Sequence, residues 1–336
     1  MQATKPLSNQ LPSRHLKLLA APACNDTLQN LRNSIKSRQR ELLPPPDFKE
    51  NLVIQAIYTG VLEPGKRFRS VLMLLTCNGL KGNAPAVLDL ACAVEMKHTA
   101  SLFMDGLACM DNAQTRRGQR AVDVQYGEDI AMLAAVALIS EVLRLVASVN
   151  GLPADSRARL VVTLSSAIGP QGLAEGQHLD LRNANGARGE FDIERVNQQK
   201  TSVLFTAALD MAATASGATD VAKAALRGAA TSIGQAFQMR DNLEDKADAA
   251  IRPMKDRNKD IGKTPMVSLL GRKVVEARMR KHLGSAVSHL RMALPRDTRL
   301  VDFTLQAFGL HLEEIESAAN GESSFKIHRD QFSATN

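Results

Sequence analysis

Long apolar segments of helical length follow one another through most of this chain, and this feature limits the folds open to it. The clearest segments lie at residues 87–104, 130–149, 160–168, 202–215, 222–239 and 275–294. Turn residues separate them at 78–79, 82–83, 150–153 and 182–190. No segment alternates apolar and polar residues as a half-buried strand does. The pattern predicts an all-α fold, a single large helical bundle.

The chain has 336 residues, and 44% of them are hydrophobic, which is enough for one large domain with a substantial core. Residues 1–46 are expected to form a flexible leader and a short polar helix at 26–43 that three prolines end. The folded domain is expected at 47–320. Residues 321–336 are expected to be a frayed polar tail.

The charge balance is basic, with 42 Lys and Arg against 35 Asp and Glu. Such a surplus suits nucleic acid, an anionic membrane or a polyanionic substrate. Aromatic residues make up only 4% of the chain and Trp is absent, so base-stacking surfaces are poorly supplied. We therefore expect no nucleic-acid partner.

Cysteine usage and the apolar runs bear on location. The four cysteines form no C-x-x-C pair, which favours a reduced protein without a disulfide framework. The N-terminus lacks the apolar core of a signal peptide. The most apolar run, residues 130–146, is interrupted by Glu141 and Arg144 and fits a buried helix better than a membrane span. We expect a cytoplasmic protein without a transmembrane segment.

Two groups of aspartates end strongly apolar helical segments, where a carboxylate is costly without a partner. Asp241 and Asp245 are four residues apart and share a helical face. Asp105 and Asp111 are six apart, so a loosened helix end must bring them together. Carboxylates that face each other across a bundle hold divalent metals, and oxygen ligands suit magnesium bridging a diphosphate. Each acid alone also fits a solvated helix end.

A series of short motifs then resembles the trans-isoprenyl diphosphate synthases (polyprenyl synthetases), in particular the bacterial geranylgeranyl diphosphate synthases. The motifs are residues 65–69 (GKRFR), 95–102 (EMKHTASL), 110–118 (MDNAQTRRG), 126–128 (YGE), 176–181 (GQHLDL), 200–201 (KT), 234–238 (GQAFQ) and 260–264 (DIGKT). The resemblance runs from about residue 51 to 312. It implies a bundle of the isoprenoid synthase type with a central active-site cavity.

The resemblance also implies roles for individual residues. The isopentenyl diphosphate is held by Lys66, Arg69, His98 and Arg117, and the allylic diphosphate by Arg116, Lys200 and Lys255. The ligands of Mg²⁺, three ions with substrate bound, are Asp105, Asp111, Asp241 and Asp245. Thr201 and Gln238 steady the carbocation or the released pyrophosphate.

Three departures from the family pattern concern this site. The motifs D-D-x-x-x-x-D and D-D-x-x-D have lost their second acid to Gly106 and Asn242. In the family these acids mostly support metal-bound water and neighbouring ligands, and such losses cost about 10- to 100-fold in metal affinity or activity. Where the family has Gly-x-Pro-Thr-x-His, residues 118–123 read GQRAVD.

Product length is implied by the residues about one helical turn before the first aspartate. Ala100 and Ser101 are small there, which predicts a pocket deep enough for a product of about twenty carbons, with Phe103 as its wall.

The implied activity is a magnesium-dependent condensation of an allylic diphosphate, farnesyl or shorter, with isopentenyl diphosphate to give geranylgeranyl diphosphate, in a homodimer. Ionisation of the allylic carbon–oxygen bond needs metal and fixed cations to absorb the charge of the leaving group. Two alternatives use the same features. One is a terpene synthase or cyclase that acts on a prenyl diphosphate, and the other is a low-activity regulatory subunit in a heteromer with another synthase.

Overall fold

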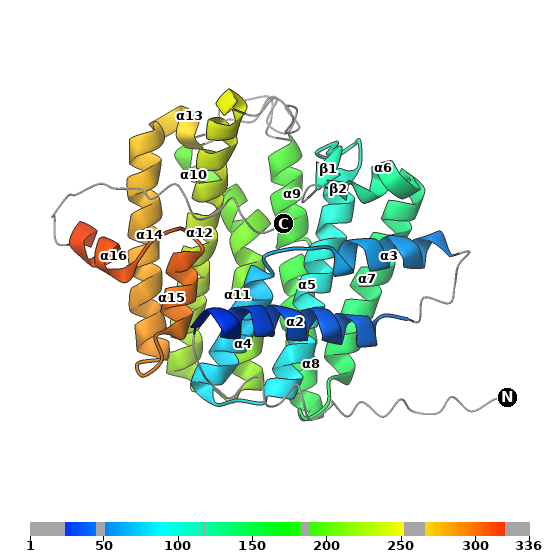
Figure 1. Cartoon of the computed structure of the whole chain (residues 1–336), viewed down its shortest axis with the longest axis horizontal. Coiled ribbons are helices and arrows are strands. Elements are labelled where there is room, and N and C mark those ends of the chain that lie inside the picture. Colours follow the sequence, from blue (N-terminus) through cyan, green and yellow to red (C-terminus); the bar gives the residue numbers. More distant parts are fainter. Residues whose placement is uncertain (1–23, 45–50, 117–118, 183–188, 252–265, 320–336) are drawn as a thin grey trace.

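The computed structural model describes residues 24–44, 51–116, 119–182, 189–251 and 266–319 (Figure 1). The α-helices are α2 (Cys24–Leu42), α3 (Leu52–Leu62), α4 (Phe68–Leu80), α5 (Ala84–Gly106), α6 (Val122–Tyr126), α7 (Glu128–Ser148), α8 (Ala154–Ile168), α9 (Leu173–Arg182), α10 (Glu190–Asn197), α11 (Val203–Ala215), α12 (Asp220–Ile251), α13 (Met266–Leu270), α14 (Arg272–Ala293), α15 (Arg299–Gln306) and α16 (Leu312–Ala319). A π-helical turn, η2 (Gln198–Ser202), joins α10 to α11. Strands β1 (Thr115–Arg116) and β2 (Gln119–Arg120) pair antiparallel.

The all-α prediction is confirmed, because each predicted apolar segment lies within or largely overlaps a helix. Two local expectations were wrong. The turn expected at residues 78–79 lies inside α4, and the chain turns instead at Lys81, whose φ of 55° ends the helix in the left-handed region. The short β1–β2 ladder was not predicted, because two-residue strands carry no alternating pattern.

Helix α5 is the centre of the bundle. Its side chains are buried on most faces, and it contacts α2, α4, α7 and α11. Figure 1 shows α7, α5, α11, α12 and α14 upright beside one another, while α2 and α3 cross them. A helix with no polar face is stable only where other helices surround it, so the composition of α5 assigns it this central place.

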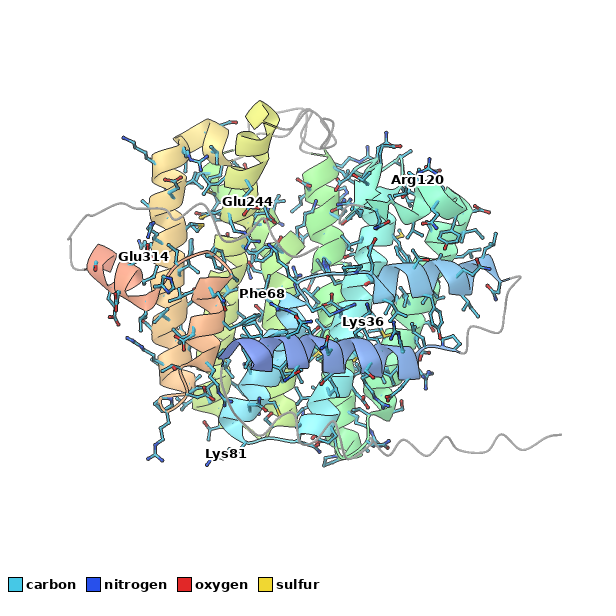
Figure 2. All side chains as sticks on the ribbon, in the orientation of Figure 1. Lys36, Phe68, Lys81, Arg120, Glu244 and Glu314 are labelled. Atoms are coloured by element: carbon cyan, nitrogen blue, oxygen red, sulfur yellow. The ribbon has the colours of Figure 1, made fainter. Side chains whose placement is uncertain are left out.

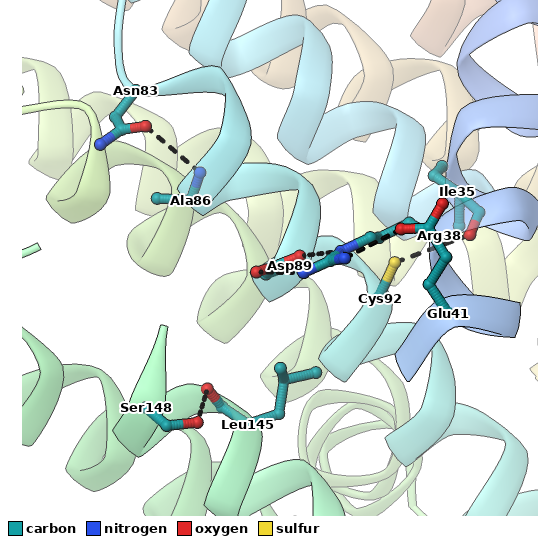
Figure 3. Close-up of polar contacts among 9 residues, drawn as sticks. All are labelled: Ile35, Arg38, Glu41, Asn83, Ala86, Asp89, Cys92, Leu145 and Ser148. Carbon is teal, nitrogen blue, oxygen red and sulfur yellow. Dashed lines mark hydrogen bonds and ion pairs between the residues drawn. The ribbon is translucent and has the colours of Figure 1, made fainter. Parts of the chain in front are cut away.

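The bundle includes α2, which lies before the predicted domain start at residue 47. Leu31 and Ile35 of α2 are fully buried. Arg38 Nε donates to Asp89 Oδ1 of α5 at 2.6 Å, and the Cys92 thiol lies 3.6 Å from the carbonyl oxygen of Ile35 (Figure 3). A buried ion pair offsets its desolvation only with good geometry, and this pair fixes α2 against α5. The core therefore extends N-terminal to residue 47.

Helix α7 is, among the described helices, the one long and apolar enough to cross a membrane by length and composition. One of its faces is buried against the bundle, where it contacts α3, α5 and α8. Ala131, Leu138 and Val142 lie on that face. The helix is therefore buried on one face and exposed on the other, so the prediction of a buried helix holds for the inner face only.

Candidate active site

A cavity of about 820 Å³ opens between α5, α9, η2, α11 and α12. Nine of the predicted site residues line it, namely Arg69, His98, Asp105, Asp111, Arg116, Lys200, Thr201, Gln238 and Asp241. Figure 2 labels Arg120 of β2 and Glu244 of α12, each close along the chain to one of the two acidic groups. The fold therefore brings together residues separated by up to 172 positions in the chain, from Arg69 to Asp241.

The remaining predicted residues are not placed in this cavity. Lys66 is exposed in the turn before α4 and is not among the lining residues, so the structure does not bring it to the site. Arg117 and Lys255 lie outside the described residues. Asp245 belongs to the helical part of α12, and its side chain lies outside the description.

The end of α5 unwinds as the spacing of its aspartates required. The helix ends at Gly106, and the Asp111 amide donates to the Asp105 carbonyl oxygen at 3.1 Å, which folds the chain back. Burial raises the pKa of Asp105, the nearby Lys200 opposes this rise, and Asp111 adds to it. Two carboxylates crowded in this way repel one another unless a cation lies between them.

Arg116 is held beside these acids by the β1–β2 ladder, in which it pairs with Gln119. Its Nη2 lies 3.7 Å from Asp111 Oδ2. Its Nε and Nη2 are buried and donate no hydrogen bond to any described residue. A guanidinium with unused donors facing a cavity is suited to bind a phosphate oxygen.

The π-helical turn η2 presents Lys200 and Thr201 to the cavity. Lys200 Nζ donates to Asp180 Oδ2 of α9 at 2.7 Å. Thr201 Oγ1 donates to Gln238 Oε1 of α12 at 2.8 Å. Short π-helical turns are frequent at functional sites because they displace side chains from the regular helical register.

A glycine on the facing helix makes this turn sterically allowed. A Cβ at Gly176 of α9 would lie 2.4 Å from the backbone nitrogen of Lys200, closer than real contacts. The backbone of α9 can thus press directly against η2.

Arg69 is oriented by aromatic rings. Its guanidinium carbon lies 4.3 Å from the centroid of the Phe205 ring and 5.9 Å from that of Phe237. Such stacking holds a guanidinium in one direction while leaving its edge for an anion. His98 lines the same cavity from α5.

The second acidic group lies on a regular helix. Asp241 lines the cavity with 41% of its side chain exposed, and its Oδ1 lies 3.4 Å from Arg240 Nη2. Asn242, where the family motif has an acid, also lines the cavity. This end of the site therefore keeps a polar side chain of similar shape at the lost position.

Lys97 lines the cavity although no role was predicted for it. Lys97 is only 4% exposed, and its ammonium group forms no hydrogen bond or ion pair with another described residue. Burial lowers its pKa to about 8, Asp105 partly opposes this, and Arg69 adds to it. A lysine inside an apolar helical segment was the signal in the sequence that could have revealed it.

Of the three residues expected to limit the length of the product, two line the cavity and one does not. Ala100 and Ser101 line the cavity. Phe103 does not, and the expectation that it forms the wall was wrong. Its ring packs against α3, where a Cβ at Gly60 would lie 2.3 Å from Phe103 Cε1. The absence of a side chain at Gly60 leaves space for the ring on this side of α5.

The acidic residues fit magnesium that is shared with a substrate. Within the part of the chain that the structure describes, no three His, Cys, Asp or Glu residues come close enough to form a metal site by themselves. Asp105 and Asp111 line the cavity from the α5 end and Asp241 from α12. Magnesium usually takes one or two carboxylates and completes its coordination with substrate phosphates and water, so two separated acidic ends suit it.

Comparisons with known proteins agree with this geometry. Geranylgeranyl diphosphate synthase of Pseudescherichia vulneris is 41% identical over 289 residues, covering 85% of this chain and 93% of that protein. The enzyme of the same name from Pantoea ananas is 42% identical over 270 residues, 80% and 88% of the two chains. The crystal structure of geranyltransferase from Helicobacter pylori, complexed with magnesium and isoprenyl diphosphate, has a TM-score of 0.75 at 24% identity. The match covers 90% of this chain and 99% of that one and concerns the fold.

Residues 50–285 match the family model described as polyprenyl synthetase, which is more than half of the chain. Because that match and the two relatives above 40% identity span the bundle that builds the cavity, the chain belongs to the polyprenyl synthetase family.

Proposed function

We propose that this protein is a magnesium-dependent geranylgeranyl diphosphate synthase, which condenses an allylic diphosphate, farnesyl or shorter, with isopentenyl diphosphate. The observation that carries the proposal is that acids from the end of α5 and from α12, cations from five elements and an apolar floor converge on one cavity. The names of the relatives at 41% and 42% identity support the same activity.

The charged lining divides between two diphosphates. Lys200 and Arg116 adjoin the acidic ends and bind the allylic diphosphate, while Arg69 and His98 bind the isopentenyl diphosphate. Asp105, Asp111 and Asp241, with Asp245, hold magnesium, three ions when substrate is bound. Magnesium held by these residues would neutralise the charge that builds on the departing diphosphate.

The rest of the lining handles the hydrocarbon and the carbocation. The oxygen atoms of the Thr201–Gln238 pair face the cavity side of η2 and α12 and steady positive charge near the reacting carbon. Apolar lining residues exclude water that would quench it, among them Ile139, Leu173, Leu181 and Leu204. A volume of about 820 Å³ accommodates a ligand of twenty carbons beside the small Ala100 and Ser101.

The direct test incubates the purified protein with Mg²⁺, farnesyl diphosphate and labelled isopentenyl diphosphate and measures product length by chromatography. A twenty-carbon product supports the proposal. Asp241→Ala serves as the inactive control, since contaminating synthase would remain active in that sample. No elongation with any divalent metal would contradict it.

The two alternatives have their own outcomes in this test. A hydrocarbon or alcohol released from farnesyl or geranylgeranyl diphosphate alone would indicate a cyclase. A chain that is inert alone but changes the rate or product of another synthase would indicate a regulatory subunit. The presence of Arg69 and His98 in the cavity favours condensation over both, since neither alternative needs a second diphosphate site.

We also propose that the protein is a homodimer, as the resemblance implies, in which a second copy covers the outer face of α7. Three large apolar side chains lie exposed on that helix, Met132, Leu133 and Val136, the last with 64% of its surface exposed. Val162 of the neighbouring α8 extends the face. Contiguous apolar surface of this kind marks an interface. Val136→Glu should therefore convert the dimer to monomer in light scattering, and a wild type that is monomeric would contradict the proposal.

A further inference from the structure

The carboxylate of Asp123 fills the space that a side chain at position 106 would need. A Cβ at Gly106 would lie 2.4 Å from Asp123 Oδ1, a distance that real Cβ atoms essentially never show, and 3.2 Å from Asp123 Cγ. The third atom nearest to this Cβ is Asp123 Oδ2, the other oxygen of the same carboxyl group, at 3.9 Å. A side chain at position 106 would therefore require the Asp123 carboxylate to leave its observed position.

The Asp123 carboxylate has an oxygen without a partner. Oδ1 is buried and accepts no hydrogen bond within the part of the chain that the structure describes. Backbone amides of Asp123 and Val124 donate to this carboxylate, yet Oδ1 itself stays unsatisfied, and a buried unsatisfied oxygen calls for a reason.

The charged neighbours of Asp123 connect it to the acidic end of the cavity. Arg116 attracts the carboxylate and Glu128 repels it. Arg116 also pairs with Asp111 and attracts Asp105. Asp123 and the two aspartates that line the cavity thus share Arg116 as a charged neighbour.

Two departures from the family pattern meet at this contact. Position 106 lacks the acid of the first motif, and position 123 has an acid where the family pattern has histidine. We propose that Asp123 replaces in space the acid missing at position 106 and acts as a positioning residue for the magnesium end of the cavity. It acts through Arg116 and through bound water, from the first turn of α6 rather than from α5. This inference rests on the magnesium site proposed above.

The experiment moves the acid between the two positions. It compares the wild type with Asp123→Asn, Asp123→Ala, Gly106→Asp and the double variant Gly106→Asp/Asp123→Ala. Binding of Mn²⁺ in the presence of inorganic pyrophosphate, followed by electron paramagnetic resonance of the free ion, gives a metal affinity that does not depend on turnover. Thermal unfolding reports folding in parallel. Asp129→Asn, an exposed acid on α7, is the matched charge control.

We expect Asp123→Asn and Asp123→Ala to weaken Mn²⁺ binding about 10- to 100-fold without lowering the melting temperature. Gly106→Asp alone is expected to weaken binding and to lower the melting temperature, because the two carboxylates collide. The double variant should recover Mn²⁺ affinity to within about threefold of the wild type, since the acid then reaches the site from α5. A purely structural role of Asp123 would not be rescued by an acid on another helix.

Two results would overturn the inference. One is an Asp123→Asn protein that binds Mn²⁺ as the wild type does, and the other is a double variant that binds no better than Asp123→Ala. Asp241→Asn separates this failure from that of the magnesium site itself. If Asp241→Asn loses binding while Asp123→Asn keeps it, only the replacement is wrong, whereas a wild type that binds no Mn²⁺ overturns both.

Discussion

Each of the two acidic ends of the cavity lacks the second acid of its aspartate-rich motif, and the local structure around the lost acid differs between them. At the end of α5 the lost position is Gly106, a buried glycine whose space the carboxylate of Asp123 occupies. On α12 it is Asn242, a half-buried side chain of nearly the same shape as aspartate that still lines the cavity. One end has changed its packing, and the other has changed only its charge.

The difference follows from the local structure. The α5 end is folded back on itself through the Asp111–Asp105 backbone hydrogen bond and is closed further by Glu128 Oε1, which accepts from the Ala108 amide at 3.1 Å. In such a crowded turn a side chain added or removed forces its neighbours to move. Asp241 lies on an uninterrupted helix with 41% of its side chain exposed, so a substitution beside it needs no repacking.

The largest expected difference between the two ends is in the loss of kcat when one aspartate is removed from each of them. Asp241 is the one aspartate of α12 among the lining residues of the described chain, whereas Asp105 has Asp111 beside it. We expect kcat to fall about 1,000-fold in Asp241→Asn and about 100-fold in Asp105→Asn. Steady-state kinetics with Asp192→Asn as an exposed control measures both. A smaller fall in kcat for Asp241→Asn than for Asp105→Asn would contradict this difference between the two ends.

The next effect concerns Lys97, whose buried charge faces Asp105 and Arg69 on the α5 side. Its pKa is about 8 in the folded protein against 10.5 as the ordinary value, so the unfolded chain binds the proton more tightly. The resulting destabilisation is fully present below pH 8 and is relieved as the pH rises toward 10.5. Lys97→Met should therefore gain about 3 kcal/mol of unfolding free energy at pH 7, a shift of about 2.5 pK units converted at 1.36 kcal/mol each.

Urea unfolding of both proteins at pH 7, 8, 9 and 10 measures this difference. The advantage of Lys97→Met should shrink as the pH rises, because the wild type loses its buried charge. An advantage that stays constant with pH would show that Lys97 is neutralised by a partner at all of these values.

The smallest effect is the restoration of the acid on α12. Asn242→Asp should raise the affinity for Mn²⁺ with pyrophosphate by up to about 10-fold and leave the melting temperature unchanged, because the two side chains have the same shape. This outcome is the opposite of that expected for Gly106→Asp. Calorimetric titration and thermal unfolding of the two single variants side by side test the contrast, and equal stability losses in both would refute it.

Much of the site was predictable because its chemistry is local in the sequence. Three of the four predicted metal ligands line the cavity, Asp105, Asp111 and Asp241, as do the predicted cations at positions 69, 116 and 200. The position of Lys66 was not predictable, since it depends on how the turn before α4 projects from the bundle. The ring of Phe103 was misplaced for a similar reason, because the missing side chain of Gly60 on another helix decides where it packs.

The helices and the types of charged group near their ends could be read from the sequence, since helical periodicity and the cost of a buried charge act over a few residues. Which of these groups share space is a property of the packed fold. It placed Asp123 against Gly106, seventeen residues away, and turned Lys97 into the same cavity as Asp105. Contacts of this kind depend on how a helix end packs against the turns that follow, which no local pattern of residues encodes.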